Sequence, residues 1–175
     1  GLNTRDCVRW VKSVLGEDFP MEEINVTSRE LYHAELDRET PVKSGLLPLL
    51  QWLQDENIPR AVATSTRHEW ALKKLRKAGI LDCFQDLVCG DQVSQGKPHP
   101  EIFLTAASKI GINPARCLVL EDSDPGVRGA RAAGMNVIQV PDVKAPSAEV
   151  REFGHLICES LQQAHQQMRQ WQGVR

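Results

Sequence analysis

Hydroxyl, ammonium and carboxylate side chains are concentrated in three short segments of the chain. The segments are Thr64-Ser65-Thr66-Arg67, Gly96-Lys97-Pro98-His99-Pro100 and Glu121-Asp122. Hydroxyls and backbone N–H groups that precede a helix can hold phosphate oxygens, and a lysine adds a compact positive charge. Adjacent carboxylates suit Mg²⁺, which typically takes one or two of them and completes its octahedron with water and phosphate oxygens. Together the segments predict a site for a phosphoryl group and a divalent cation.

Each segment also has a plainer interpretation. Thr64, Ser65 and Thr66 are residues that cap helices, and Lys97 is compatible with a solvated loop. The acidic pair is harder to explain as capping, because a helix start needs only one acid and two adjacent acids repel each other. We therefore expect Glu121-Asp122 to bind a cation, while the roles of the other two segments stay open at this point.

Several residues near these segments are interpreted as structural. Asp124 precedes Pro125, which suits the first position of a helix, so Asp124 is expected to cap that helix. His99 has no second His or Cys spaced to share a metal ion. The tryptophans are expected to be packing anchors in helices rather than a stacking platform; they are Trp10, Trp52, Trp70 and Trp171.

The elements that must position these segments alternate between helices and strands. Helical patterns extend over residues 4–15, 21–39, 45–55, 69–78, 99–110, 125–133 and 161–171. Short apolar runs indicate strands at residues 60–64, 87–89, 117–121, 136–140 and 155–158. This alternation predicts an α/β fold with a doubly wound parallel sheet, covered by helices on both faces. In such a sheet ligands bind beyond the carboxyl ends of the strands, where the three polar segments are expected to meet.

Composition restricts the classes of protein that fit. The chain has 175 residues, of which 41% are hydrophobic and 25% charged, as is typical of a folded globular protein. Its net charge of −2, without a long basic run, argues against nucleic acid or a membrane surface as the main partner. No apolar stretch approaches the roughly 20 residues of a membrane span. The first part holds no strand pattern, so we divide the chain into a helical piece, 1–40, and an α/β core, 41–175.

The cysteines are scattered and odd in number, and no C-x-x-C pair is present. They are Cys7, Cys83, Cys89, Cys117 and Cys158. A zinc site needs closely spaced ligands, so this distribution argues against one. We expect the thiols to be small buried hydrophobes in a reducing compartment, which predicts a cytoplasmic protein.

In their order and spacing, the three polar segments resemble those of the haloacid-dehalogenase-like superfamily. The resemblance is strongest to phosphatases and phosphomutases of the β-phosphoglucomutase and phosphoglycolate-phosphatase type. It runs through most of residues 41–145 and includes Gly129-Ala-Arg-Ala-Ala-Gly-Met135. The resemblance implies a Rossmann-like core with a small helical cap, of which residues 1–40 would be the later part. It also implies a Mg²⁺-dependent phosphatase or phosphomutase that acts on a small phosphorylated metabolite through an aspartyl-phosphate.

The resemblance assigns roles to residues of the first two segments. Thr64 matches a hydroxyl that binds the transferring phosphoryl group, with the Ser65 backbone beside it. Thr66 and Arg67 complete this substrate-binding segment. Lys97 matches a lysine that neutralises the nucleophile and the phosphate, so Thr64 and Lys97 are the expected catalytic residues.

Two further assignments come from the resemblance. Glu121 and Asp122 match the acidic pair that holds Mg²⁺. Asn3-Thr-Arg5 resembles a cap loop that touches the substrate. Specificity in this family comes largely from the cap, so the identity of the substrate does not follow from these residues.

One motif of the family has no counterpart here. The first motif, D-x-D-x-[TV] after an N-terminal strand, supplies the nucleophilic Asp and the general acid/base. Asp122-Ser-Asp124 has the D-x-D spacing but belongs to the metal motif by position. The missing strand lies in the middle of the family's sheet, so its absence would leave two unpaired strand edges. We therefore expect the sequence to be a piece of a longer chain, and the chain as given to be inactive.

Two other functions fit some of these residues. A non-catalytic module with the same fold would bind phosphate or Mg²⁺ without turnover. A bacterial receiver domain also combines acids, a Thr or Ser and a Lys-Pro pair. In that domain the acidic pair comes first, whereas here Glu121-Asp122 follows Lys97-Pro98. The choice between phosphatase and mutase, and the oligomeric state, do not follow from the sequence.

Overall fold

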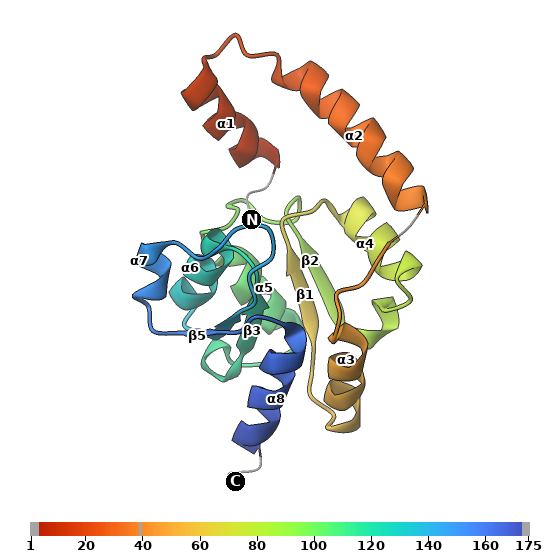
Figure 1. Cartoon of the computed structure of the whole chain (residues 1–175), viewed down its shortest axis with the longest axis vertical. Helices are drawn as coiled ribbons and strands as arrows, with labels where there is room; N and C mark the ends of the chain where they lie inside the picture. Colours follow the sequence, from red (N-terminus) through yellow and green to blue (C-terminus); the bar gives the residue numbers. More distant parts are fainter. Residues whose placement is uncertain (1–3, 39, 173–175) are drawn as a thin grey trace.

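The computed structural model describes residues 4–38 and 40–172, which form an α/β core beneath a pair of helices (Figure 1). The helical pair consists of α1 (Thr4–Leu15) and α2 (Met21–Arg38). The core then follows in the order α3 (Leu46–Asp55), β1 (Ala61–Thr64), α4 (His68–Lys77), η1 (Leu81–Cys83), β2 (Asp86–Cys89), α5 (Glu101–Lys109), η2 (Pro114–Arg116), β3 (Leu118–Glu121), α6 (Asp124–Ala132), β4 (Asn136–Gln139), α7 (Ala148–Arg151), β5 (Leu156–Ile157) and α8 (Leu161–Gln172). The predicted α/β fold is confirmed.

The helices and strands agree closely with the sequence patterns. Each predicted element is present, with ends that differ by one or two residues at most; residue 39 lies outside the described residues. The predicted helix ends at Gly79 and Gly134 are confirmed, because these residues have φ angles of 69° and 73°. Glycine adopts this left-handed conformation at little cost, which is why it terminates helices so often. The short elements η1, η2 and α7 were not predicted.

The strands form two parallel sheets, which agrees with the two unpaired strand edges expected from the missing strand. In the first, β1 pairs with β2, with Ala61 opposite Asp86 and Thr64 opposite Cys89. The second has the order β3-β4-β5, also parallel. In the described part of the chain β1 and β3 belong to different sheets, so the sheet is divided between these two strands. We call this division the break.

One layer of helices covers both sheets on the same face. α5 packs on β1 and β2 while α6 packs on β3 and β4, and the two helices share an apolar cluster that includes Phe103 and Val127. On the other face α4 packs around Leu87, and α8 packs around Ile138. The two sheets are therefore joined through the α5–α6 layer and through the contact of α3 with α8.

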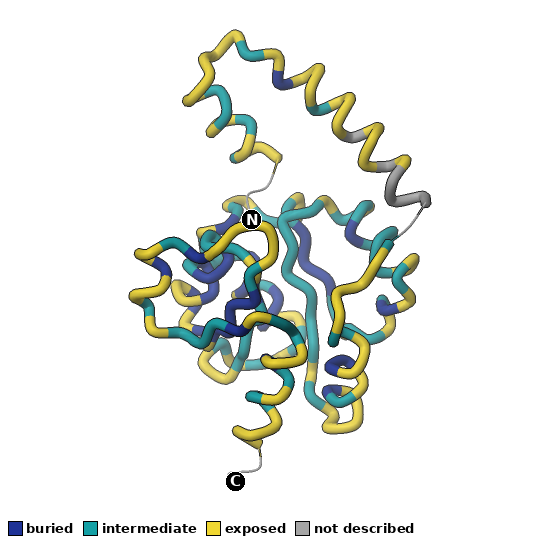
Figure 2. Tube along the Cα trace, viewed as in Figure 1, coloured by how far each residue is buried: buried dark blue, intermediate teal, exposed yellow. Residues whose placement is uncertain are grey.

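The strands beside the break are less buried than their outer neighbours. All residues of β1 and the first three of β3 are half-buried, whereas the last three of β2 and of β4 are buried (Figure 2). In a continuous parallel sheet covered on both faces, the inner strands would be the most protected. The reversed distribution shows that both sheets are open on the side that faces the break.

The backbone of β1 presents polar groups to the break. Gln85 N donates to Arg60 O, so the residue before β1 points its carbonyl toward β2. Backbone groups of successive strand residues point to alternate sides. The carbonyls of Ala61 and Ala63 therefore point away from β2, into the break.

The same alternation applies to β3 on the opposite side. Asn136 N donates to Cys117 O, so the residue before β3 points its carbonyl toward β4. The backbone groups of Leu118 and Leu120 consequently point into the break. Two rows of main-chain polar groups thus face each other across the break.

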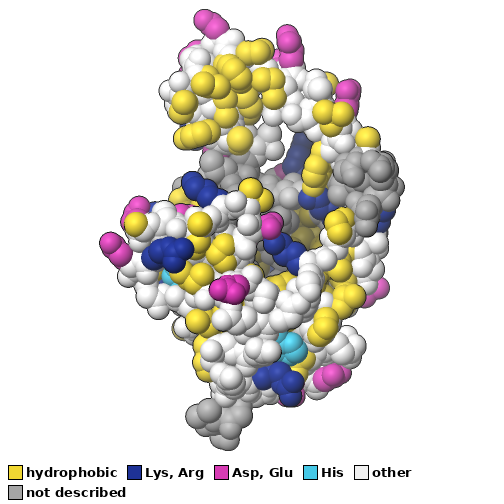
Figure 3. Space-filling model, in the orientation of Figure 1, with side chains coloured by type: hydrophobic (Ala, Val, Ile, Leu, Met, Phe, Trp, Pro, Cys, Tyr) yellow, Lys and Arg dark blue, Asp and Glu magenta, His cyan; other side chains and the backbone are white. Residues whose placement is uncertain are grey.

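Among the residues that the structure describes, the helical pair is attached to the core through few contacts. No residue of α1 is buried, and its apolar side chains gather on the surface of the upper part of the molecule (Figure 3). Arg5 Nη2 donates to Ser94 O at 2.7 Å, and Lys74 Nζ lies 4.7 Å from the centre of the Tyr32 ring. Neither helix of the pair, nor any other in the described residues, is long and apolar enough to cross a membrane.

The tryptophans do not share one structural role. Trp10 and Trp171 are 60% and 49% exposed, so their expected role as packing anchors is wrong. Trp52 is half-buried, with its ring centre 5.0 Å from that of His165. Trp70 is also half-buried, but it lines a cavity. The helical position of the four tryptophans was predicted correctly. Their burial depends on packing partners from other elements, which the sequence pattern does not identify.

The cysteines are all unpaired thiols. Cys89 and Cys158 are buried as expected, whereas Cys7 on α1 is exposed, which corrects the expectation for that residue. Burial raises the pKa of the Cys89 thiol to about 11. The buried thiols are therefore protonated near neutral pH and behave as small apolar side chains.

Candidate active site

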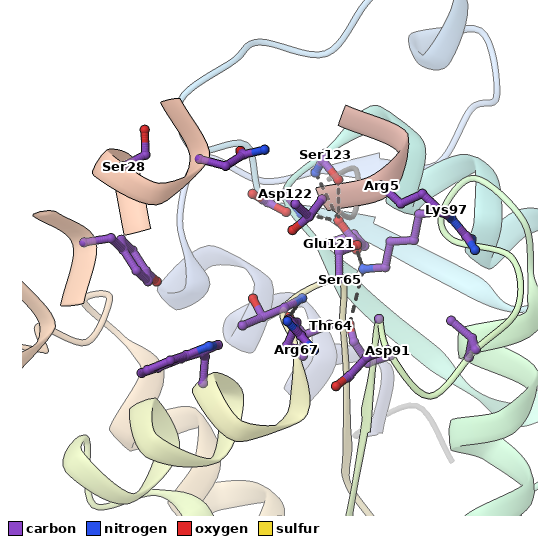
Figure 4. Close-up of a pocket in the computed structure, with 18 of the residues that line it drawn as sticks. Arg5, Ser28, Thr64, Ser65, Arg67, Asp91, Lys97, Glu121, Asp122 and Ser123 are labelled. Carbon is purple, nitrogen blue, oxygen red and sulfur yellow. Dashed lines mark hydrogen bonds and ion pairs between the residues drawn. The ribbon is translucent and has the colours of Figure 1, made fainter. Parts of the chain in front are cut away.

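A cavity of about 1160 Å³ lies between the helical pair and the carboxyl ends of β1 and β3 (Figure 4). The core contributes Ala63, Thr64, Ser65, Thr66, Arg67, Trp70, Gly90, Asp91, Val93, Lys97, Leu120, Glu121, Asp122 and Ser123 to its wall. The helical pair contributes Thr4, Arg5, Asn25, Ser28 and Tyr32. The structure thus brings all three polar segments of the sequence to one cavity.

Lys97 reaches across the break at the floor of this cavity. Its side chain is 7% exposed, and its ammonium forms an ion pair with Glu121 at the end of β3. The same Nζ donates to Ala63 O of β1 at 3.2 Å and lies 4.8 Å from the centre of the Phe103 ring. The interpretation of Lys97 as a solvated loop lysine is therefore wrong.

The Glu121 carboxylate is held from several sides. While Oε1 pairs with Lys97, Oε2 accepts from the backbone N–H groups of Asp122 and Ser123 at 3.0 and 3.1 Å, and from Ser123 Oγ at 3.0 Å. Burial alone would raise the pKa of Glu121, but Lys97 and these donors outweigh it and hold the pKa below its usual value. A Cβ atom at Gly126 would lie only 1.9 Å from the carboxyl carbon, so glycine is required there.

Asp122 differs from its neighbour in exposure. Its side chain is exposed at the cavity, where Figure 4 shows it beside Glu121 and Ser123. Partial burial and the adjacent Glu121 carboxylate raise the pKa of Asp122. A cation that shared the two carboxylates would relieve this repulsion, which is the physical basis for the predicted metal site.

The residue that caps α6 is Ser123, not Asp124 as predicted. Ser123 Oγ accepts from Gly126 N at 3.4 Å, and Asp124 is already the first residue of the helix. The Asp124 carboxylate instead accepts from Ser147 N at 3.1 Å and from Gln139 Nε2 at 3.3 Å. The prediction failed because these two partners are distant in sequence.

The segment after β1 forms a turn and does not cap α4. Thr64 Oγ1 accepts from Thr66 N at 3.2 Å, and Arg67, which precedes the helix, makes no side-chain capping bond. Asp91 from the loop after β2 takes that role, because its Oδ1 accepts from His68 N at 2.9 Å. The alternative that this segment is a simple helix cap is therefore wrong.

Sequence reasoning did not identify several residues of the cavity wall. Trp70 was interpreted as a packing residue, and Asn25, Ser28 and Tyr32 were not singled out. The last three are spaced three and four residues apart, which places them on one face of α2. A polar and aromatic stripe at that spacing is the signal that could have identified them.

The cavity also includes part of the loop that the resemblance associated with substrate. Thr4 and Arg5 line its wall, although they form the first turn of α1 and not a loop; Asn3 lies outside the described residues. Arg5 is the cation that the helical pair places at the cavity, and Figure 4 shows it near Lys97.

The acidic pair fits Mg²⁺ as a partial site. Within residues 4–38 and 40–172, no group of three or more His, Cys, Asp or Glu side chains is arranged to hold a metal ion. Mg²⁺ usually needs only one or two protein carboxylates, because water and phosphate supply its other oxygen ligands. Asp122 faces the cavity, and Glu121 Oε1 accepts from one described donor, Lys97 Nζ, so this oxygen keeps a second lone pair, whereas Oε2 already accepts from three donors. The two residues are therefore compatible with a Mg²⁺ ion shared with a phosphorylated ligand.

Comparisons with known proteins find a matching family model and several named relatives. A family model for haloacid dehalogenase-like hydrolases matches residues 4–134. The chain is 40% identical over 126 residues to a bifunctional riboflavin kinase/FMN phosphatase of Arabidopsis thaliana, which covers 70% of this chain and 32% of that protein. It is 32% identical over 157 residues to a beta-phosphoglucomutase of Bacillus subtilis, which covers 83% and 69% of the two chains.

The fold matches solved structures as well. A Thermotoga maritima protein provisionally named a beta-phosphoglucomutase has a TM-score of 0.78 and 25% identity, with coverage of 97% of this chain and 79% of that one. The chain spans 32%, 66% and 47% of the lengths of three curated relatives that it matches.

Proposed function

The chain belongs to the haloacid dehalogenase-like hydrolase family, and from this premise we propose that it carries most of the active site of a Mg²⁺-dependent phosphatase or phosphomutase. The proposed substrate is a small phosphorylated metabolite, which accords with relatives named for FMN phosphatase and beta-phosphoglucomutase activities. The observation that carries this proposal is the meeting of Thr64, Lys97, Glu121 and Asp122 at one cavity. The unpaired thiols support the reducing cytoplasm as the place of action.

The phosphoryl group would be held by the segments after β1 and β2. The Thr64 hydroxyl and the backbone N–H groups of the following turn donate to its oxygens, and the Lys97 ammonium offsets its negative charge. Because Lys97 and Glu121 are almost fully buried, this charge acts in a medium of low polarity. Phosphoryl transfer depends mostly on such positioning and electrostatic stabilisation.

Mg²⁺ would be held by Asp122 and Glu121. When bound, the ion supplies positive charge that neutralises phosphoryl oxygens and orients the group for transfer. The backbone N–H groups of Asp122 and Ser123 fix the Glu121 carboxylate. Gly126 has no Cβ atom, so the carboxylate can occupy the space beside it. These residues keep the Glu121 carboxylate in place before a ligand arrives.

The nucleophile is proposed to come from a strand seated in the break. The main-chain groups of β1 and β3 that face the break would pair with a parallel strand, whose carboxyl end would lie beside Lys97. An Asp there would attack phosphorus while the bond to the leaving oxygen breaks and a second Asp protonates that oxygen. Water, or a second substrate in a mutase, would then take the phosphoryl group from the Asp.

Hydrolysis of p-nitrophenyl phosphate with Mg²⁺ tests this proposal. Two proteins are compared: the chain as given, and the chain extended by the N-terminal D-x-D strand of the Bacillus subtilis relative. We expect turnover only in the extended protein. Turnover by the chain as given would contradict the need for an added Asp, and an extended protein that folds yet stays inactive would contradict the phosphatase proposal.

A binding measurement covers the case in which the extended protein fails to fold. Calorimetric titration of the chain as given should detect inorganic phosphate in the presence of Mg²⁺. Thr64→Val should weaken phosphate binding, and Asp122→Asn should weaken the dependence on Mg²⁺. Asp124→Asn is the matched control, because its carboxylate is directed to Ser147 and Gln139. Phosphate binding that ignores the first two substitutions would contradict the assigned site.

A further inference from the structure

The two ends of the cavity differ in chemistry. The floor at the carboxyl ends of β1 and β3 holds hydroxyl, ammonium and carboxylate groups. The outer wall, where α2 meets α4, holds two aromatic rings, Tyr32 and Trp70. The proposed function uses only the floor, so the aromatic end needs a separate explanation.

Tyr32 ends a stripe of side chains that α2 directs to the cavity. Asn25, Ser28 and Tyr32 follow each other at spacings of three and four residues, which places them on one helical face. The stripe changes along the helix from an amide and a hydroxyl to an aromatic ring. Tyr32 contacts Lys74 of the core and still leaves 44% of its surface exposed.

Trp70 belongs to the same corner of the cavity. It lies one helical turn before Lys74 on α4, and Lys74 Nζ is 4.7 Å from the centre of the Tyr32 ring. The two rings therefore come from the helical pair and from the core, and both line the same cavity. Aromatic rings that line a polar cavity offer stacking surfaces for a planar group, at little conformational cost.

One ligand can reach both ends, because Thr64 and Lys97 at the floor line the same cavity as Tyr32 and Trp70. A phosphorylated triose or pentose would leave the aromatic end unused. A ligand with a phosphate, a hydroxylated linker and a planar ring would match the floor, the polar part of the α2 stripe and the two rings.

We propose that the substrates are phosphate monoesters whose alcohol carries a planar heterocycle, with the ring bound at Trp70 and Tyr32. This inference rests on the proposed phosphatase function and specifies its leaving group. The ring-bearing part of the ester stays with the alcohol oxygen when the bond to phosphorus breaks. Specificity would thus be set at the wall that the helical pair shares with α4.

Calorimetric titration with Mg²⁺ tests this inference on the chain as given. Uridine 5′-monophosphate, adenosine 5′-monophosphate and FMN are compared with ribose 5-phosphate, which shares the phosphorylated pentose of the nucleotides but lacks a ring base. We expect at least one ring-bearing ester to bind about 10-fold more tightly or better, since stacking on an aromatic side chain contributes on that order. Trp70→Leu should remove this advantage without changing the affinity for ribose 5-phosphate.

Two control variants separate stacking from structural damage. Trp70→Phe keeps a planar ring and should retain most of the preference, whereas Trp171→Leu, which alters an exposed tryptophan outside the cavity, should retain all of it. Equal affinities for ribose 5-phosphate and all three ring-bearing esters would overturn this inference alone. Failure of every ester to bind would overturn the proposed function, and this inference with it.

Discussion

The floor and the roof of the cavity are built in opposite ways. On the floor, Lys97 and Glu121 are buried, paired with each other and tied to backbone groups of both sheets. On the roof, α1 has no buried residue and touches the core through the Arg5 bond to Ser94, while α2 does so through Tyr32 and Lys74. Groups that must stabilise a phosphoryl group need fixed positions, and the buried, paired side chains of the floor meet that need.

The same contrast explains where substitutions should be costly. A change on the floor disturbs buried charges. It also disturbs the contacts by which Lys97 links Ala63 of β1 with Glu121 of β3. A change on the roof removes exposed contacts that water can replace. Four substitutions test this difference, and a fifth, at His155, tests a partly buried group elsewhere in the core; they are taken in order of decreasing expected effect.

Removing Lys97 should cause the largest loss of stability. Lys97→Met leaves the Glu121 carboxylate buried without its cation, and such a change typically costs about 3–5 kcal/mol. Urea unfolding of the chain as given measures this cost. The double variant Lys97→Met/Glu121→Gln should recover more than half of it, because the unpaired charge is gone. A loss below ~1 kcal/mol would show that the pair is not buried as described.

Asp122→Asn should remove activity while leaving the fold intact. In the protein extended by a D-x-D strand, we expect kcat to fall about 10²- to 10³-fold at saturating Mg²⁺, the range seen when one electrostatic contact to the transition state is lost. The unfolding midpoint should hardly change, because the Asp122 side chain is exposed. Asp124→Asn is the matched control and should keep at least a third of the activity. Comparable losses in both variants would refute a specific metal role for Asp122.

Gly126→Ala tests how tightly the floor is packed. The added Cβ would lie within about 2 Å of the Glu121 carboxyl group, so the carboxylate must shift away from its donors. Overpacking of this kind costs about 1–3 kcal/mol. Urea unfolding should show this loss, and Mg²⁺-dependent phosphate binding should weaken in parallel. Unchanged stability would mean that the carboxylate has room to move.

His155 should make stability depend on pH in a defined direction. Burial, and then Arg131, hold its pKa below the ordinary value of 6.5, and its buried Nδ1 has no hydrogen-bond partner. The unfolded chain therefore binds this proton more readily than the folded chain. The stabilising contribution of the neutral ring is complete above about pH 6.5 and is lost as the pH falls from there toward the folded-state pKa.

The measurement is the urea midpoint at pH 7.5, 6.5 and 5.5. His155→Gln should flatten part of the decline between the last two values, since glutamine carries no proton to bind. His165→Gln removes a second histidine whose pKa is also lowered by burial, and it should flatten a separate part. A steeper decline in His155→Gln than in the parent chain would contradict the sign of this effect.

Arg5→Ala should have the smallest effect. The lost bond to Ser94 O is exposed, and contacts of this kind contribute up to about 1 kcal/mol. We expect no measurable shift of the unfolding midpoint but faster amide hydrogen exchange in α1. A shift as large as that of Gly126→Ala would mean that the roof is as firmly held as the floor.

Local patterns were sufficient to predict most of the fold. The strand that ends at Glu121 follows from its apolar run, and the helix that ends before Gly134 follows from its spacing and its terminal glycine. Parallel pairing follows from alternation of strands and helices. The break could be expected only through the family resemblance, because no property of residues 61–64 or 118–121 distinguishes an inner strand from an edge strand.

The candidate site was predictable in part for the same reason. Thr64, Lys97 and the acidic pair stand directly after predicted strands, so topology brings them together. Asp91 capping α4, and Asp124 bonding to Gln139, depend on partners that are distant in sequence. Trp70 was assigned to packing because helical spacing alone does not show which side of α4 faces solvent, core or cavity.

The break has a consequence for handling the protein. Open strand edges are templates on which other chains can add, so two copies could pair through β1 or β3. Self-association would then increase with protein concentration. It would compete with the pairing of β1 and β3 to a strand of the same polypeptide. Light scattering across a dilution series would measure this self-association. A short synthetic peptide that pairs with β1 and β3 in the break should suppress it.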